Sequence, residues 1–194
     1  MPRGKHSVAY LDIETNYVGQ FKPTEDRFFR DFGNHQITVL GIRLLSTEAD
    51  VFTQLVGKDI TRENVLSLFQ GAKRIVTYNG RSIPDALKGR VGFDLPVIAA
   101  QIGITLDKEF EHTDLVPECW KRNLYGGQKK VEEALGLKRK LPSKDGAWAM
   151  ATWREFKATG NTNYLADLLL YNKEDVFMLR EIENKLAELL PNQK

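Results

Sequence analysis

The stretch that most constrains this chain is residues 10–15, Tyr-Leu-Asp-Ile-Glu-Thr, where two acids interrupt the end of an apolar segment. Residues 8–13 are mostly β-branched, aromatic or aliphatic, and such a composition predicts a short buried strand. Asp12 and Glu14 are two positions apart, so in an extended chain both side chains point to the same face of the sheet. Two neighbouring carboxylates repel each other and lose hydration unless a cation neutralises them. The pair therefore has two interpretations: solvated acids at a strand end, or hard oxygen ligands for Mg²⁺ or Mn²⁺.

Length and composition set only broad limits. The 194 residues predict a single domain, residues 1–194, with enough chain to bury a core; two small domains are the alternative. A formal net charge of +2 is too small to indicate a nucleic-acid partner by itself. The sequence shows no apolar run of the length that a signal peptide or a membrane span needs. We therefore expect a cytoplasmic protein without a membrane partner.

The order of the expected elements is that of an α/β chain. Strands are expected at residues 8–13, 37–45, 51–55 and 74–78, and residues 111–116 are a strand or a strand end. Helices are expected at residues 61–70, 93–102, 118–122, 129–135, 147–157 and 163–190. Residues 16–36 mix phenylalanines with cations and are open to helical and loop interpretations; these side chains either stack bases or form a hydrophobic patch with a solvated rim.

Two further acids stand out on later elements. Asp94 lies at the start of the expected helix 93–102, where helix capping explains an acid without any chemistry. Asp175 follows Tyr171 by four residues in the expected helix 163–190, so the two side chains lie one helical turn apart. A solvated pair accounts for that spacing as well. Taken singly, each acid has an ordinary explanation.

Taken together, the four acids and the tyrosine resemble the DEDDy exonucleases of the ribonuclease-H-like superfamily. The matching motifs are Leu11-Asp12-Ile13-Glu14-Thr15, Tyr78-Asn79-Gly80 with Phe93-Asp94-Leu95-Pro96, and Tyr171-Asn172-Lys173-Glu174-Asp175. The sister group has a histidine five residues before the last aspartate, a position that Leu170 holds here. Over residues 7–186 the chain is most similar to the predicted exonuclease domains of the YprB-like type. It also resembles the proofreading domains of B-family DNA polymerases.

The resemblance implies a ribonuclease-H-like α/β fold, in which a central mixed sheet of about five strands is flanked by helices. Residues 8–13 would form a central strand, with residues 37–45 antiparallel to it. The implied activity is 3′-5′ exonucleolytic hydrolysis of phosphodiester bonds at the 3′ end of single-stranded DNA or RNA, supported by two Mg²⁺ or Mn²⁺ ions. The implied metal ligands are Asp12, Glu14, Asp94 and Asp175. Tyr171 would orient the attacking water, and Thr15 and Asn79 would contact the substrate.

One segment departs from the family pattern. Residues 81–92 separate the asparagine-glycine motif from the phenylalanine-aspartate motif, which family members join by only a few residues. The insertion makes Asp85 a rival to Asp94, which we prefer because its neighbours match the family. The insertion itself is either a basic loop that contacts substrate or a tolerated surface insertion.

Three further points stay open in the sequence. The basic residues 138–144 either bind substrate or form a solvated charged loop, whereas His112 and Asp114 are expected to support the site by hydrogen bonds. The alternative functions are a catalytically idle nucleic-acid- or partner-binding module and a structure-selective endonuclease; the full set of acids argues against the idle module. No residue identifies the sugar of the substrate, and no motif encodes a protein partner such as a polymerase or helicase.

Overall fold

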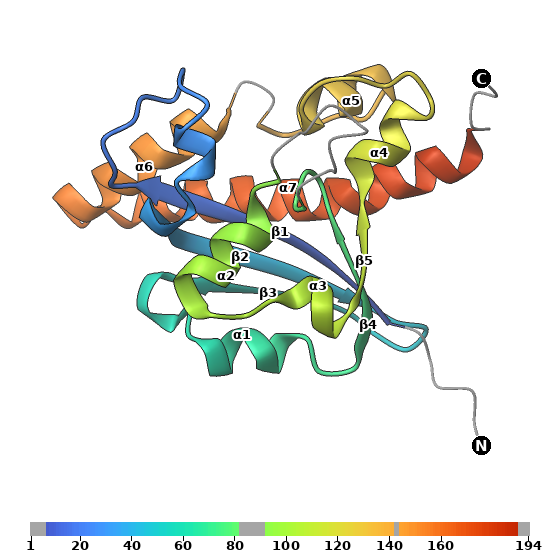
Figure 1. Ribbon diagram of the computed structural model, residues 1–194, viewed down its shortest axis with the longest axis horizontal. Coiled ribbons are helices and arrows are strands. Elements are labelled where there is room, and N and C mark those ends of the chain that lie inside the picture. The colour runs from blue at the N-terminus through green and yellow to red at the C-terminus, as the bar shows by residue number, and fades with distance from the viewer. Residues whose placement is uncertain (1–6, 82–91, 142–143, 190–194) are drawn as a thin grey trace.

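A five-stranded mixed sheet forms the centre of the computed structural model, which describes residues 7–81, 92–141 and 144–189 (Figure 1). The strands are β1 (Ser7–Tyr17), β2 (His35–Leu45), β3 (Asp50–Val56), β4 (Ala72–Thr77) and β5 (Glu111–Asp114). Their order in the sheet is β3-β2-β1-β4-β5, with β1 antiparallel to β2 and parallel to β4. The expected α/β fold, with a central first strand and an antiparallel second one, is confirmed.

Helices cover both faces of this sheet. They are α1 (Arg62–Leu68), α2 (Asp94–Ile102), α3 (Leu106–Glu109), α4 (Leu115–Trp120), α5 (Gln128–Ala134), α6 (Gly146–Thr159) and α7 (Thr162–Glu188). One apolar cluster joins the sheet to α1, α2 and α3, and a second joins it to α4, α5 and α7. The longest of these helices, α7, runs across the sheet (Figure 1) and also packs against α6. Among the described helices, none combines the length and apolar character that a membrane crossing requires.

The connecting segments follow local rules. Thr61 precedes α1, and its hydroxyl accepts a hydrogen bond from the backbone N–H of Asn64, the N-cap geometry that its position predicts. Gly71 ends the turn after α1 with a φ of 84°, in the left-handed region that glycine tolerates best. Within residues 16–36, which were open to helical and loop interpretations, the structure has two short 3-10 helices, Phe28–Arg30 and Phe32–Asn34.

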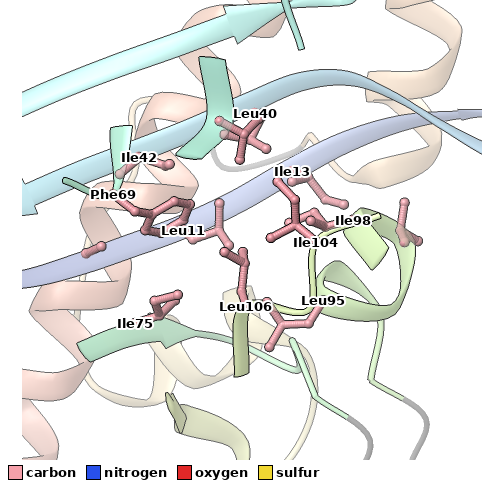
Figure 2. Packing of buried hydrophobic residues seen from close by; sticks show 13 residues of the cluster. Leu11, Ile13, Leu40, Ile42, Phe69, Ile75, Leu95, Ile98, Ile104 and Leu106 are labelled. Carbon is pink, nitrogen blue, oxygen red and sulfur yellow. The ribbon is translucent and has the colours of Figure 1, made fainter. Parts of the chain in front are cut away.

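Alternation along β1 decides which face of the sheet each acid occupies. Leu11 and Ile13 are buried in the cluster with α1 and α2, and Figure 2 shows Ile13 near Ile98 of α2 and Leu11 nearer Phe69 and Leu106. Tyr10 packs in the opposite cluster, against α7. Because side chains alternate along a strand, Asp12 and Glu14 point to the same face as Tyr10, toward α7.

β1 is longer than the strand expected at residues 8–13. A register shift between Glu14 and Thr15 lets the pairing with β2 continue as far as Tyr17, which lies opposite His35. Asp12 and Glu14 therefore lie inside the strand, Asp12 half-buried and Glu14 only 6% exposed. The interpretation of the two acids as solvated residues at a strand end is wrong.

Gly41 of β2 lets α7 approach the sheet beside Asp12, its partner in the register. A Cβ atom at Gly41 would lie 2.2 Å from Oδ1 of Asn172, whose amide is held by Asp12 and Gln54. We expect Gly41→Ala to lower the free energy of unfolding by about 1–3 kcal/mol, because the overpacked contact forces the helix away from the sheet. Urea denaturation measures this change. Gly33→Ala is the control, since nothing lies within 4 Å of a Cβ there, and equal stability of the two variants would contradict the close approach.

Candidate metal centre

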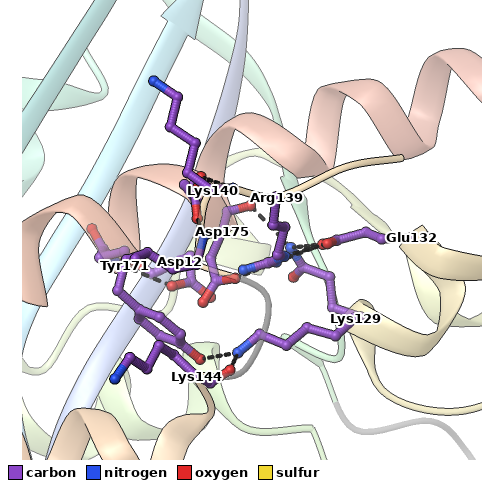
Figure 3. A network of polar contacts seen from close by, with 12 residues as sticks. Asp12, Lys129, Glu132, Arg139, Lys140, Lys144, Tyr171 and Asp175 are labelled. Carbon is purple, nitrogen blue, oxygen red and sulfur yellow. Dashed lines mark hydrogen bonds and ion pairs between the residues drawn. The ribbon is translucent and has the colours of Figure 1, made fainter. Parts of the chain in front are cut away.

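Three carboxylates from β1 and α7 meet on one face of the sheet. Asp12, Glu14 and Asp175 each offer one oxygen, and these oxygens lie within 4.8 Å of one another. β1 supplies two of them because alternate side chains share a face. α7 crosses the same face and supplies the third, and Figure 3 shows Asp175 beside Asp12. The structure thus brings together three of the four acids singled out in the sequence.

Asn172 links α7 to Asp12. Its Nδ2 donates a hydrogen bond to Oδ2 of Asp12 over 2.9 Å, and its Oδ1 accepts one from Nε2 of Gln54, also over 2.9 Å. The side chain of Asn172 is fully buried, so these bonds fix the orientation of the Asp12 carboxyl. No role was expected for Asn172 from the sequence, although it precedes Asp175 by three residues and so shares its helix face.

Burial and mutual repulsion make the cluster unfavourable as free carboxylates. Burial raises the pKa of Asp12 and of Glu14 well above the usual values, and the carboxylate of Asp175 raises both further. Burial also raises the pKa of Asp175 itself. Oε1 of Glu14 is buried and has no hydrogen-bond partner among the described residues. An all-oxygen donor set with an unpartnered buried oxygen fits a hard divalent cation such as Mg²⁺ or Mn²⁺.

Asp94 is buried at the first residue of α2, 6% exposed. The cap residue of this helix is Phe93, and it makes no side-chain cap; Asp94 is therefore not the cap, although its place in the first turn is one that the helix dipole favours for an acid. The charge of Asp94 raises the pKa of Asp12 and Glu14, so Asp94 lies near the cluster without belonging to its three closest oxygens. Its rival, Asp85, lies outside the described residues.

The end of β4 positions α2. The backbone N–H of Phe93 donates to the carbonyl of Asn79 over 2.8 Å, and that of Leu95 donates to Gly80 over 3.0 Å. Asn79 itself has a φ of 63°, which is uncommon for a residue with a side chain. Its Oδ1 is buried and unpartnered among the described residues. The asparagine-glycine motif thus holds Asp94 in place through its backbone.

Asp114 supports this junction, as expected from the sequence. Its carboxylate accepts hydrogen bonds from the backbone N–H groups of Asn79, Arg81 and Val116, over 2.9, 3.1 and 3.0 Å. Nε2 of His112 lies 2.9 Å from the hydroxyl of Thr77 in the neighbouring strand. Neither residue belongs to the acid cluster.

Tyr171 lies one turn before Asp175 and is buried, 4% exposed. Lys129 donates a hydrogen bond from Nζ to the Tyr171 hydroxyl over 2.7 Å and also binds the carbonyl of Lys144 (Figure 3). Burial raises the pKa of Tyr171, and the charges of Asp175 and Glu14 raise it further. The phenol is therefore protonated at neutral pH, and because its oxygen accepts from Lys129, its own proton is available to donate.

Arg139 fits neither interpretation of the basic residues 138–144, whereas Lys138 and Lys140 are exposed and residues 142–143 lie outside the described residues. The side chain of Arg139 is only 4% exposed and forms ion pairs with Glu132 and Asp175 (Figure 3). The carboxylate of Glu174 accepts the backbone N–H groups of Lys140 and Leu141, over 2.7 and 3.0 Å, and so ties this loop to α7. Nothing in the sequence distinguishes Arg139 from the solvated cations beside it.

A cavity of about 320 Å³ adjoins Glu14. Aromatic rings form much of its wall, together with Thr15 and the first turn of α6. The rings of Phe28 and Phe93 each lie 4.8 Å from the ring of His35. Nδ1 of His35 lies 3.3 Å from the hydroxyl of Thr15, the residue after Glu14. Thr15 therefore contacts the aromatic wall of the cavity directly beside the acid cluster.

A family profile described as the RNase H superfamily matches residues 9–187. The chain belongs to the RNase H superfamily. The matched range runs from β1 to α7 and contains all three acids of the cluster. RNase H superfamily proteins are typically metal-dependent phosphodiester hydrolases that act on nucleic acids, in agreement with an all-carboxylate cluster. A search of curated proteins finds no match to this chain.

Proposed function

We propose that this RNase H superfamily protein is a two-metal-dependent 3′-5′ exonuclease of the DEDDy type, similar to the YprB-like domains. The convergence of Asp12, Glu14 and Asp175 on one face of the sheet carries the proposal. Tyr171, one turn before Asp175, supports the DEDDy assignment, and the 3′-5′ polarity is taken from the resemblance to that group. The substrate would be the 3′ end of single-stranded DNA or RNA.

The acids of the cluster would hold two Mg²⁺ or Mn²⁺ ions, together with Asp94. When bound, such ions stabilise the charge on the attacking and leaving oxygens of a phosphodiester. Asp12 is oriented for this role by Asn172, and Asp94 is oriented by the backbone bonds between α2 and the end of β4. These contacts hold the ligands before substrate arrives, so that little reorganisation is needed during the reaction.

Tyr171 would orient the attacking water. With its pKa raised by burial, the phenol does not act as a general base at neutral pH. The hydroxyl would instead donate a hydrogen bond to the water, while its oxygen accepts a hydrogen bond from Nζ of Lys129 over 2.7 Å.

The cavity beside Glu14 would receive the terminal nucleotide. Aromatic walls allow stacking with any base, and a metal-bound phosphate needs no sequence readout. Thr15 lines this cavity, and Oδ1 of Asn79 has no hydrogen-bond partner among the described residues; both residues would contact the substrate.

The choice of Asp94 over Asp85 can be tested by substitution. We expect Asp94→Asn to reduce metal-dependent cleavage by about 100-fold or more, because a neutral amide is a weak ligand for a hard cation. Asp85→Asn should leave the rate within about twofold of the unchanged protein, because the proposal gives Asp85 no part in holding the metal ions. Initial rates on single-stranded DNA measure both effects, and the reverse result would move the third acid to position 85.

The activity itself is tested by a time course on single-stranded DNA and RNA labelled at either end, with Mg²⁺, Mn²⁺ or chelator. We expect a 3′ label to leave as a mononucleotide, a 5′-labelled strand to shorten one nucleotide at a time, and chelator to stop both. Asp12→Asn protein purified in parallel excludes a contaminating nuclease. Internal fragments released first would favour the structure-selective endonuclease, and no cleavage of any substrate would favour the idle binding module.

A further inference from the structure

Arg139 lies between the acid cluster and a second buried acid. Its Nη2 contacts Oδ1 of Asp175 and lies 2.6 Å from Oε1 of Glu132, while Nε also binds Glu132 (Figure 3). Both side chains of the ion pair between Arg139 and Glu132 are buried, with Glu132 2% and Arg139 4% exposed. Nη1 of Arg139 is buried without a hydrogen-bond partner among the described residues. The guanidinium is therefore a desolvated charge held against a candidate metal ligand.

The guanidinium is anchored from two helices. Nε2 of Gln128 donates to Oε1 of Glu132 over 2.9 Å and to the backbone carbonyl of Asp175 over 3.0 Å. Gln128 and Glu132 belong to α5, and Asp175 belongs to α7. Moving Arg139 away would leave Glu132 as an uncompensated buried charge, which is strongly unfavourable. We therefore expect Arg139 to stay in place when a cation binds to the cluster.

The position of Arg139 has two electrostatic consequences of opposite sign. The fixed positive charge stabilises the three neighbouring carboxylates when no metal is bound. The same charge repels a divalent cation and keeps one oxygen of Asp175 from binding it. Removing the charge should therefore destabilise the metal-free protein and strengthen metal binding.

We propose that Arg139 is an internal counter-cation of the acid cluster, a positioning residue that holds Asp175 by one oxygen and weakens metal binding. The inference rests on the proposed function, because it requires that the cluster binds a divalent cation. It assigns to one arginine of the basic loop a task distinct from substrate binding.

Arg139→Gln tests the proposal in the full-length protein, with Mn²⁺ alone as the probe and without substrate. We expect the melting temperature in chelator to fall by about 5–15 °C, as for a broken buried ion pair. The dissociation constant for Mn²⁺, measured by titration calorimetry, should fall about tenfold or more from the change in charge. Saturating Mn²⁺ should then recover part of the lost melting temperature.

Arg43→Gln is the matched control. Arg43 is another buried arginine, its side chain 8% exposed, and it binds Asp50 through Nε and Nη2 over 2.8 and 2.7 Å. The melting temperature of this variant should lie below that of the unchanged protein by the same amount in chelator and in Mn²⁺. Its dissociation constant for Mn²⁺ should stay within about twofold of that of the unchanged protein. Arg139→Lys, which keeps the charge but loses the two-nitrogen fork, should bind Mn²⁺ like the unchanged protein.

The outcomes separate this proposal from the metal site itself. If Arg139→Gln behaves like Arg43→Gln, or binds Mn²⁺ more weakly than the unchanged protein, Arg139 is not a counter-cation, while the metal site stands. If the unchanged protein shows no response to Mn²⁺, both the metal site and the counter-cation are overturned. Should Arg139→Gln fail to fold, the double variant Glu132→Gln/Arg139→Gln leaves no stranded acid at position 132, and the same tightening of Mn²⁺ binding is required of it.

Discussion

Asp12→Asn is expected to abolish metal-dependent cleavage and, at the same time, to stabilise the metal-free protein. The rate should fall by about 1000-fold or more, because a neutral amide replaces one of the carboxylates proposed to hold the metal ions. In chelator, the free energy of unfolding should rise by about 1–2 kcal/mol, since one of three repelling acids is removed. Asn172 and the substituted amide can still form a hydrogen bond.

The stability gain should depend on pH. The pKa of Asp12 is raised in the folded protein, so the folded state binds its proton more tightly than the unfolded state does. Stability in chelator is then lost as the pH rises through the raised pKa and the carboxylate becomes charged. The advantage of Asp12→Asn should therefore be larger at pH 8.5 than at a pH near the ordinary pKa of an aspartate, about 4, as urea denaturation at both pH values would measure.

Asp31→Asn is the control for this prediction. Asp31 accepts a hydrogen bond from Tyr17 over 2.6 Å and others from Asn34, and these bonds lower its pKa. Its replacement should remove a favourable carboxylate, so the protein should gain no stability and should keep its metal-dependent cleavage. An Asp12→Asn protein that is destabilised in chelator, or that still cleaves, would contradict the proposed cluster.

Tyr171→Phe is expected to slow cleavage by about 10–1000-fold, the effect of losing one positioned polar group. The dissociation constant for Mn²⁺ should stay within about twofold of the unchanged protein, because a neutral phenol is not a ligand of choice for a hard cation. Cleavage rates and Mn²⁺ titrations together separate water positioning from metal binding.

Tyr10→Phe is the matched control. Tyr10 is also buried, 3% exposed, and its hydroxyl donates to Glu183 of α7 over 2.7 Å; neither residue belongs to the acid cluster. This variant should lose stability and keep its turnover. Unchanged turnover in Tyr171→Phe would reduce Tyr171 to a packing residue, in contact with the ring of Trp148 at 5.5 Å.

Much of the fold and part of the site could be predicted because they follow local rules. Strand alternation puts Asp12 and Glu14 on one face, and the helical repeat puts Tyr171 and Asp175 one turn apart. The hairpin of β2 and β3 needs only a short turn, and its strands were found at nearly their observed bounds. The length of β1 was underestimated because a bulge, which no local pattern marks, extends its pairing.

The partners of the acids could not be predicted, because they come from distant parts of the chain. Gln54 reaches Asn172 across 118 positions of sequence, and Lys129 reaches Tyr171 across 42. In the sequence Arg139 does not differ from its solvated neighbours; it is buried because its loop packs against α7 in the folded protein. Such pairings are decided by how elements pack, not by the residues next to each side chain.

Anomalous diffraction from crystals equilibrated with Mn²⁺ tests most directly whether these acids form a metal centre. Two Mn²⁺ peaks are predicted, held by Asp12, Glu14 and Asp175 together with Asp94, and both should be absent or weakened in crystals of Asp12→Asn. A cluster that stays free of Mn²⁺ at saturating concentration, with Arg139 still paired to Asp175, would contradict a metal-dependent nuclease site.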